Sequence, residues 1–163
     1  MTIEAEFAYM ASFTEIYAKL TDETFLRSKY EDIGSRNLRF SECAQDDEVF
    51  RIEWTREVPA NPPPFARKFF GEWNSLQEIM EWTLEDDGSA HADYQCKISG
   101  IPGVLEGEFD LRPDGSGCVE EIIMKATIRI PIVGGKISTL VEDDCKQQLD
   151  KEDAFTRRQL GED

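Results

Sequence analysis

Residues 122–160 read IIMKATIRIPIVGGKISTLVEDDCKQQLDKEDAFTRRQL, and the spacing of the apolar residues changes within this stretch. Before Pro131 the apolar residues alternate with others, which is typical of a strand with one buried face. After Gly134 and Gly135, residues 136 to about 160 contain no proline or glycine and carry an apolar stripe at helical spacing. The stripe consists of Ile137, Leu140, Val141, Cys145, Leu149 and Phe155. At about 1.5 Å per residue the predicted helix is more than about 30 Å long, and its stripe requires a large apolar partner.

The upstream segments supply that partner. Six segments between residues 38 and 130 repeat the two-residue period, as where Ile52 and Trp54 alternate with Arg51 and Glu53. Turn sequences such as Asp-Gly and Pro-Asp-Gly-Ser-Gly separate the segments. This pattern predicts an antiparallel sheet with one apolar face and one charged, solvated face.

The N-terminal residues add a seventh strand and two short helices. Residues 2–10 alternate in the same way. Ser12 followed by Glu15 is a capping-box pattern that predicts a helix start. Thr21 is predicted to cap a second helix from residue 22 to about 32, which Gly34 ends.

The resulting order is one strand, two short helices, six strands and a long terminal helix, which predicts a single α+β domain over residues 1–163. A curved seven-stranded antiparallel sheet around a C-terminal helix is the helix-grip arrangement, and in this order the chain resembles the START-like (SRPBCC) superfamily. Two stretches, FARKFFG at residues 65–71 and IPIVGGKI at residues 130–137, resemble a bacterial branch of unknown function. The resemblance implies an apolar cavity between sheet and helix that holds a hydrophobic or amphipathic ligand.

The charge of the chain limits its partners. The 163 residues include 34 Asp and Glu against 18 Lys and Arg, a formal charge of -16. Nucleic-acid binders carry basic clusters, so this balance argues against a nucleic-acid partner and also disfavours docking on anionic lipid. No apolar run approaches the length of an integral membrane segment. We expect a cytoplasmic protein, because the start of the chain resembles no targeting signal and the four cysteines lack disulfide or CxxC spacing.

Few residues suggest catalysis or a cofactor. The single histidine, His91, is predicted to point outward from its strand, with no neighbouring nucleophile to form a catalytic pair. One histidine and scattered cysteines do not match zinc-ligand spacing, and the acidic runs lack the spacing of a calcium loop. We therefore predict no catalytic residue, no metal and no cofactor.

Charged residues on the apolar side of the strands are more informative. Glu42, Arg56 and Glu78 fall on this side, where a charge is costly unless it is paired. Arg56 and Glu78 lie on consecutive strands, and either contact between them or contact with a ligand satisfies both. An alternative is that a bulge re-aims such residues. The residues predicted to line the ligand site are Phe40, Ile52, Trp54, Arg56, Glu78, Trp82, Tyr94, Phe109, Met124 and Leu140.

The leading functional hypothesis is the binding of a hydrophobic small molecule, lipid-like or polycyclic, in a cavity of moderate size. The Pro- and Phe-rich residues 61–70 are expected to border its mouth, with Phe69 or Phe70 starting the next strand. Two alternatives remain open: an enzyme of the polyketide cyclase or dehydratase type that uses Arg56, Glu78 or Tyr94, and a protein-interaction module that uses the acidic surface. Converging titratable groups favour the enzyme, whereas a filled cavity favours the interaction module. The sequence leaves the oligomeric state unknown.

Overall fold

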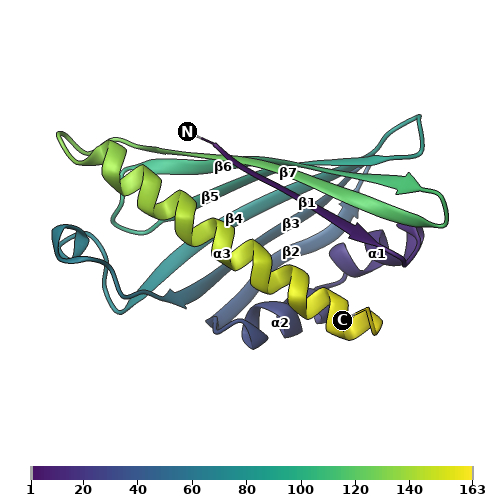
Figure 1. Cartoon of the computed structure of the whole chain (residues 1–163), viewed down its shortest axis with the longest axis horizontal. Coiled ribbons are helices and arrows are strands. Elements are labelled where there is room, and N and C mark those ends of the chain that lie inside the picture. Colours follow the sequence, from purple (N-terminus) through teal and green to yellow (C-terminus); the bar gives the residue numbers. More distant parts are fainter. Residues whose placement is uncertain (1, 163) are drawn as a thin grey trace.

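A computed structural model describes residues 2–162 and has the predicted element order. The helices are α1 (Phe13–Leu20), α2 (Glu23–Asp32) and α3 (Gly134–Leu160), with a short 3-10 turn, η1 (Pro64–Ala66). The strands are β1 (Ile3–Tyr9), β2 (Arg36–Asp46), β3 (Val49–Pro59), β4 (Trp73–Leu84), β5 (Ala90–Ile98), β6 (Gly103–Asp114) and β7 (Gly117–Ile128). They form one antiparallel sheet in the order β1-β7-β6-β5-β4-β3-β2. Figure 1 shows α3 crossing one face of this sheet diagonally, with α2 near its C-terminal end, so the helix-grip prediction is confirmed.

The two faces of the sheet differ as the two-residue period predicts. Ile52 and Trp54 of β3 are buried on the face that α3 covers. Arg51, between Phe50 and Ile52, instead binds Glu53 and Glu81 at 3.3 and 3.1 Å on the outer face. Burying the apolar side chains on a single face requires the helices to cover that face, which places the core between sheet and α3.

The ends of the short helices differ in one respect from the prediction. Ser12 accepts a hydrogen bond from the Glu15 backbone N–H and caps α1, as expected. The expectation that Thr21 caps the second helix is wrong, because Asp22 accepts from the Phe25 N–H and is the N-cap of α2. Thr21 is the C-terminal cap of α1, and its hydroxyl donates to the Tyr17 carbonyl. The two helices follow each other so closely that neighbouring residues close one and open the next.

The long helix begins at Gly134, two residues before the predicted start. A side chain at Gly134 would place its Cβ 2.7 Å from the Ile128 carbonyl oxygen, so glycine allows α3 to start directly against the end of β7. Two further contacts hold the helix to that strand. Ser138 Oγ accepts from the Ile128 N–H, and the buried Glu142 carboxylate accepts from the Ala126 N–H at 3.0 Å.

Strand β2 contains an irregularity that changes the direction of Glu42. The pairing with β3 shifts between Phe40 and Glu42, which is the signature of a β-bulge. Glu42 consequently pairs with Arg51 on the outer face, with 3.2 Å between Nε and Oε2. Of the two readings left open for Glu42, a charge that faces the cavity or one that a bulge re-aims, the structure therefore has the second. Within residues 2–162, no helix combines the length and the apolar composition needed to cross a bilayer.

Candidate functional site

A cavity of about 220 Å³ lies between the sheet and α3. Apolar side chains dominate its walls and come from both layers. Its apolar lining includes Ile52, Trp54, Met80, Trp82, Phe109, Ile122, Met124, Leu140 and Leu149. Large aromatic side chains occupy part of the space, because Tyr94 packs against both Trp54 and Phe109, with ring centroids 6.4 and 5.8 Å apart. The cavity is therefore of moderate size, as expected.

Of the residues predicted to line the ligand site, all but Phe40 line this cavity. Phe40 lies on β2, the edge strand, and stacks behind Trp54 with ring centroids 6.2 Å apart. The Arg27 guanidinium of α2 also contacts Phe40, 5.3 Å from the ring centroid. Phe40 therefore supports the wall from behind, on an edge strand that packs against α2.

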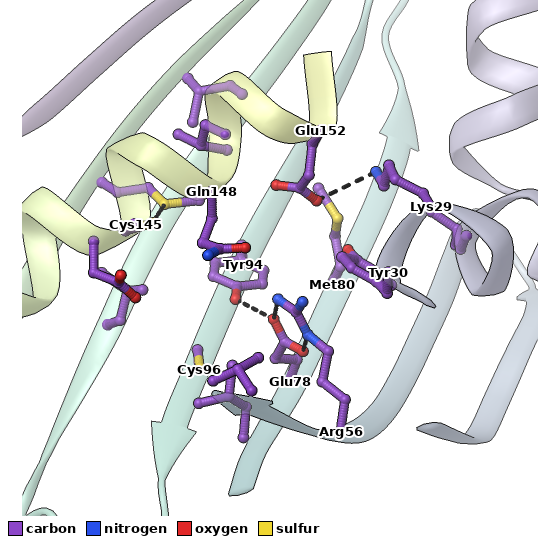
Figure 2. Close-up of a pocket in the computed structure, with 18 of the residues that line it drawn as sticks. Lys29, Tyr30, Arg56, Glu78, Met80, Tyr94, Cys96, Cys145, Gln148 and Glu152 are labelled. Carbon is purple, nitrogen blue, oxygen red and sulfur yellow. Dashed lines mark hydrogen bonds and ion pairs between the residues drawn. The ribbon is translucent and has the colours of Figure 1, made fainter. Parts of the chain in front are cut away.

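One group of polar residues crosses the strands on the cavity side. We call Ser35, Arg56, Glu78 and Tyr94 the floor cluster. Trp54 of β3 pairs with Glu78 of β4, so Arg56 lies diagonally across from Glu78 on the same face. Arg56 donates from Nε to Glu78 Oε2 at 2.8 Å and from Nη2 to Oε1 at 3.0 Å (Figure 2). Tyr94 donates to Glu78 Oε1 at 2.6 Å, and Arg56 Nη1 donates to the Ser35 hydroxyl.

The two charges of the floor cluster, on Arg56 and Glu78, neutralise each other. Arg56 is 7% exposed and Glu78 only 1%, so the pair is shielded from water. Burial lowers the pKa of Arg56, but the charge and hydrogen bonds of Glu78 outweigh it and hold that pKa well above its ordinary value. The guanidinium also lies 4.1 Å from the Tyr30 ring centroid. Of the two predicted partners for Arg56, the structure therefore provides Glu78.

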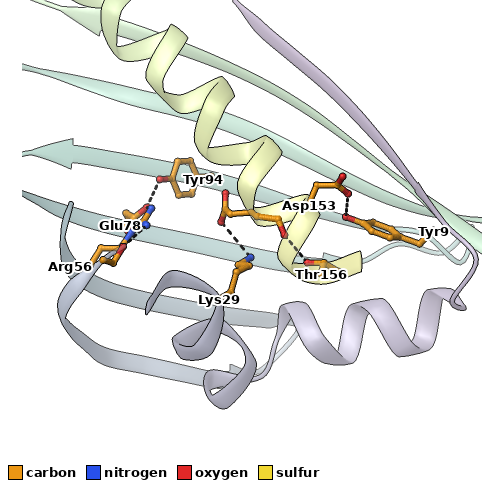
Figure 3. Close-up of polar contacts among 9 residues, drawn as sticks. Tyr9, Lys29, Arg56, Glu78, Tyr94, Asp153 and Thr156 are labelled. Atoms are coloured by element: carbon orange, nitrogen blue, oxygen red, sulfur yellow. Dashed lines mark hydrogen bonds and ion pairs between the residues drawn. The ribbon is translucent and has the colours of Figure 1, made fainter. Parts of the chain in front are cut away.

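A second polar group, absent from the sequence prediction, lies nearer the C-terminal end of α3. We call Tyr9, Lys29, Glu120, Glu152 and Asp153 the inner cluster. Lys29 of α2 pairs with Glu152 at 3.4 Å (Figure 2), and the Tyr9 hydroxyl donates to Asp153 at 3.0 Å (Figure 3). All five residues line the cavity.

Glu120 is the unusual member of the inner cluster. It is 6% exposed, and within residues 2–162 it has no hydrogen-bond or ion-pair partner. Burial raises its pKa to about 7; Lys29 opposes this shift, and the charges of Glu152 and Asp153 add to it. The sequence contained the signal for Glu120, because it shares the inward side of β7 with Ile122 and Met124. Lys29 and Glu152 likewise lie on the apolar stripes of their helices.

Residues of the connection between β3 and β4 also line the cavity. Ala60, Asn61, Pro62 and Phe70 belong to this lining, as expected for a loop at the mouth. The expectation that Phe69 or Phe70 starts the next strand is wrong, because β4 begins at Trp73. The prolines cannot donate to a strand ladder, so the chain forms η1 before it rejoins the sheet.

The outer face carries the single histidine. His91 Nδ1 lies 2.8 Å from Asp110 and Nε2 lies 3.2 Å from Asp93. Burial lowers the pKa of His91, but the hydrogen bonds to these two carboxylates outweigh it and leave the pKa raised. His91, Asp93 and Glu108 bring ligand-type atoms within 4.8 Å of one another, on a solvated surface outside the cavity lining. The predicted outward direction of His91 is confirmed.

A seven-stranded antiparallel sheet around a long C-terminal helix is the helix-grip fold, and solved structures share this fold. A START superfamily protein from Mycobacterium smegmatis matches with a TM-score of 0.61 and 13% identity, over 98% of each chain. A protein from Thermus thermophilus matches with a TM-score of 0.60 and 16% identity, over 95% of this chain and 96% of that one. A STAR-related lipid transfer protein from Xanthomonas axonopodis matches with a TM-score of 0.58 and 15% identity, over 84% of this chain and 77% of that one.

The chain belongs to the family described as "Protein of unknown function (DUF2505)", whose profile matches residues 4–160. No curated protein matches the chain. The predicted resemblance to the START-like superfamily and to a branch of unknown function is confirmed, and the structural matches show the fold.

Proposed function

We propose that this protein binds a small hydrophobic or amphipathic molecule in the cavity between the sheet and α3. The main support for this proposal is the cavity itself, about 220 Å³ of space with mainly apolar walls where a packed core would otherwise lie. Protein interiors are close-packed, and an unfilled apolar space costs stability. A ligand that fills this space recovers the lost contacts.

The volume limits the size of the ligand. An apolar cavity of about 150 Å³ accommodates benzene, and sites for drug-sized ligands span about 300–1,000 Å³. The cavity of about 220 Å³ lies between these values. It suits a molecule with one or two fused rings or a chain of medium length, and it is too small for a two-chain lipid.

Acid–base catalysis is the second candidate, and the floor cluster is the observation that favours it. Titratable groups converge there on the cavity side. However, Glu78 already accepts two hydrogen bonds from Arg56 and one from Tyr94. Burial raises the pKa of Tyr94 well above its ordinary value, so the phenol stays protonated near neutral pH and is not available as a base. Ligand binding is therefore the better-supported function.

Quenching of tryptophan fluorescence by naphthalene tests the proposal, because Trp54 and Trp82 both line the cavity. We expect saturable quenching in the unmodified protein. In Cys145→Phe, which enlarges a cavity-lining side chain of α3, the affinity should fall at least about tenfold, a loss of about 1.4 kcal/mol. The matched control is Gln147→Phe, which places the same ring on an exposed position of the same helix and should leave the affinity unchanged. Absence of saturable quenching, or equal affinity in Cys145→Phe, contradicts the proposal.

A further inference from the structure

The charges around the cavity are unequal. Two cationic side chains line it, Lys29 and Arg56, and each is bound to a carboxylate of the lining, Glu152 and Glu78 respectively. Three further acidic side chains of the lining remain: Glu120, Asp144 and Asp153. The Asp153 carboxylate accepts hydrogen bonds from the Tyr9 hydroxyl and from Arg157 Nε, each at 3.0 Å. Among the described residues, no cationic group of the lining is left over to neutralise an anionic ligand.

Glu120 is the acceptor that the protein leaves open. Buried polar side chains are hydrogen-bonded in the large majority of cases, and one without a protein partner requires an explanation. Glu120 lines the cavity, is more than nine-tenths buried and has no donor within hydrogen-bond distance among the described residues. Its partner must therefore come from whatever occupies the cavity.

We propose that the cavity binds amphiphiles through a hydrogen-bond-donating headgroup, a hydroxyl or an ammonium, which contacts the Glu120 carboxyl, and that it disfavours carboxylates. This inference rests on the proposed function and adds the chemistry of the ligand to it. A donor supplies the bond that Glu120 lacks. A carboxylate in the same place meets Glu120, Glu152 and Asp153, three groups of its own charge, and the one cation of the inner cluster, Lys29, is already paired with Glu152.

The inner cluster suits an amphiphile because apolar walls adjoin it. Leu26 and Ile122 line the same cavity and are buried. In the floor cluster, Arg56 is paired with Glu78, so this part of the lining has no unpaired cation to bind an anionic group. The ligand's apolar part therefore occupies the space above the sheet, with its donor towards β7 and the C-terminal half of α3.

A matched series of eight-carbon probes tests this inference: 1-octanol, n-octylamine and octanoate, measured by isothermal titration calorimetry at pH 7.5. Octanol and octylamine should each bind at least about tenfold more tightly than octanoate, because each supplies the hydrogen-bond donor that Glu120 lacks. In Glu120→Leu, and in Glu120→Gln as a closer isostere, the preference over octanoate should fall to less than about threefold. Glu106→Leu removes the same charge from an exposed position of β6 and should keep the preference.

The outcomes separate this inference from the proposed function. Octanoate binding as tightly as octanol, or an unchanged preference in both Glu120 variants, overturns the headgroup assignment and leaves water as the partner of Glu120. Toluene, which has no headgroup, is included as an apolar probe. If neither toluene nor any eight-carbon probe binds the folded protein, the proposed function itself fails.

Discussion

The Arg56 guanidinium and the Glu78 carboxylate form two parallel hydrogen bonds, at 2.8 and 3.0 Å, in the wall of the cavity. The antiparallel pairing of β3 and β4 places the two residues diagonally on one face, and neither side chain is more than 8% exposed. Two buried charges in this geometry are stable together, whereas either one alone is strongly destabilising. The pair therefore fixes the shape of the cavity floor.

The pair predicts a large and specific effect on stability. Arg56→Met leaves Glu78 buried without its counter-charge, and it should lower the free energy of unfolding by about 3–5 kcal/mol. The double variant Arg56→Met/Glu78→Met should recover much of this loss, since no charge is then left buried. Arg51→Met is the control, because Arg51 makes its ion pairs on the outer face and should cost less than about 1 kcal/mol. Equal losses for Arg56→Met and Arg51→Met in urea unfolding would show that the buried pair has no special role.

Tyr94 provides a smaller, separable contribution. Tyr94→Phe keeps the ring against Phe109 but removes the hydrogen bond of 2.6 Å to Glu78, while both Arg56 bonds remain. We expect a loss of about 1.5–3 kcal/mol in the free energy of unfolding, the usual range for one hydrogen bond with a charged acceptor. Tyr17→Phe is the control, because the Tyr17 ring stacks on Phe13 and its hydroxyl makes no hydrogen bond within residues 2–162. A loss in Tyr94→Phe no larger than in the control would contradict this assignment.

Glu120 predicts a pH-dependent loss of stability. Its pKa rises on folding from 4.5 to about 7, so between these values the folded state binds more protons than the unfolded state. Stability then falls as the pH rises through this window, by about 3 kcal/mol in total, and the loss is complete above pH 7. Lys29 on α2 opposes the shift, while Glu152 and Asp153 on α3 increase it.

Chemical denaturation of Glu120→Gln at pH 5 and pH 8 tests this expectation. The variant should be more stable than the unmodified protein at pH 8 and differ little from it at pH 5. Glu106→Gln, a neutralised residue on the exposed face of β6, serves as the control for the change in net charge. A variant that is equally or less stable at pH 8 would mean that Glu120 is well solvated or paired in solution.

The cysteines predict slow thiol chemistry in the folded state. Burial raises the pKa of Cys145 to about 12 and that of Cys96 further, and both line the cavity. Because the thiolate is the nucleophile, iodoacetamide at pH 8 should modify these two thiols only after denaturation. Cys43 is also half-buried and burial raises its pKa too, but it lies outside the cavity lining and provides the internal comparison. Mass spectrometry of the peptides measures the order, and rapid labelling of Cys96 in folded protein would refute it.

Two adjacent glycines predict opposite effects. Gly134→Ala places a Cβ 2.7 Å from the Ile128 carbonyl oxygen, so the start of α3 has to move and the protein should lose stability. Gly135→Ala meets nothing within 4 Å and lies in the first turn of the helix. It should be neutral or stabilise the fold by up to about 1 kcal/mol. Thermal unfolding of the two variants compares them directly, and a loss of the same size in both would rule out the close approach as the cause.

Most of the fold was predictable because its signals are local. The change from two-residue to helical spacing near Pro131 is a property of consecutive residues, as is the Ser12 cap of α1. The misplaced details involve competition between neighbours. Asp22 caps α2 although Thr21 is also a capping residue, and the bulge after Phe40 depends on how β2 pairs with β3.

The part of the site that could be predicted follows from side-chain parity, the alternation of inward- and outward-pointing positions along each strand. Ile52, Trp54, Arg56 and Glu78 point inward because their positions alternate with exposed ones. Parity alone does not give partners across the molecule, and the inner cluster was missed for this reason. Tyr9 and Asp153 are 144 residues apart in the chain and meet only when α3 lies on the sheet.

The elements, their order and the apolar face that they share thus follow from the amino-acid sequence, since periodic spacing acts through geometry within each element. The tertiary structure decided which charges lie in the cavity wall and how each is satisfied. Arg56 is neutralised because β3 pairs with β4 in one register, and Glu120 is left open because no donor from α2, α3 or the described part of β1 reaches it. These outcomes depend on distances of a few ångströms between distant parts of the chain, which only the packed fold defines.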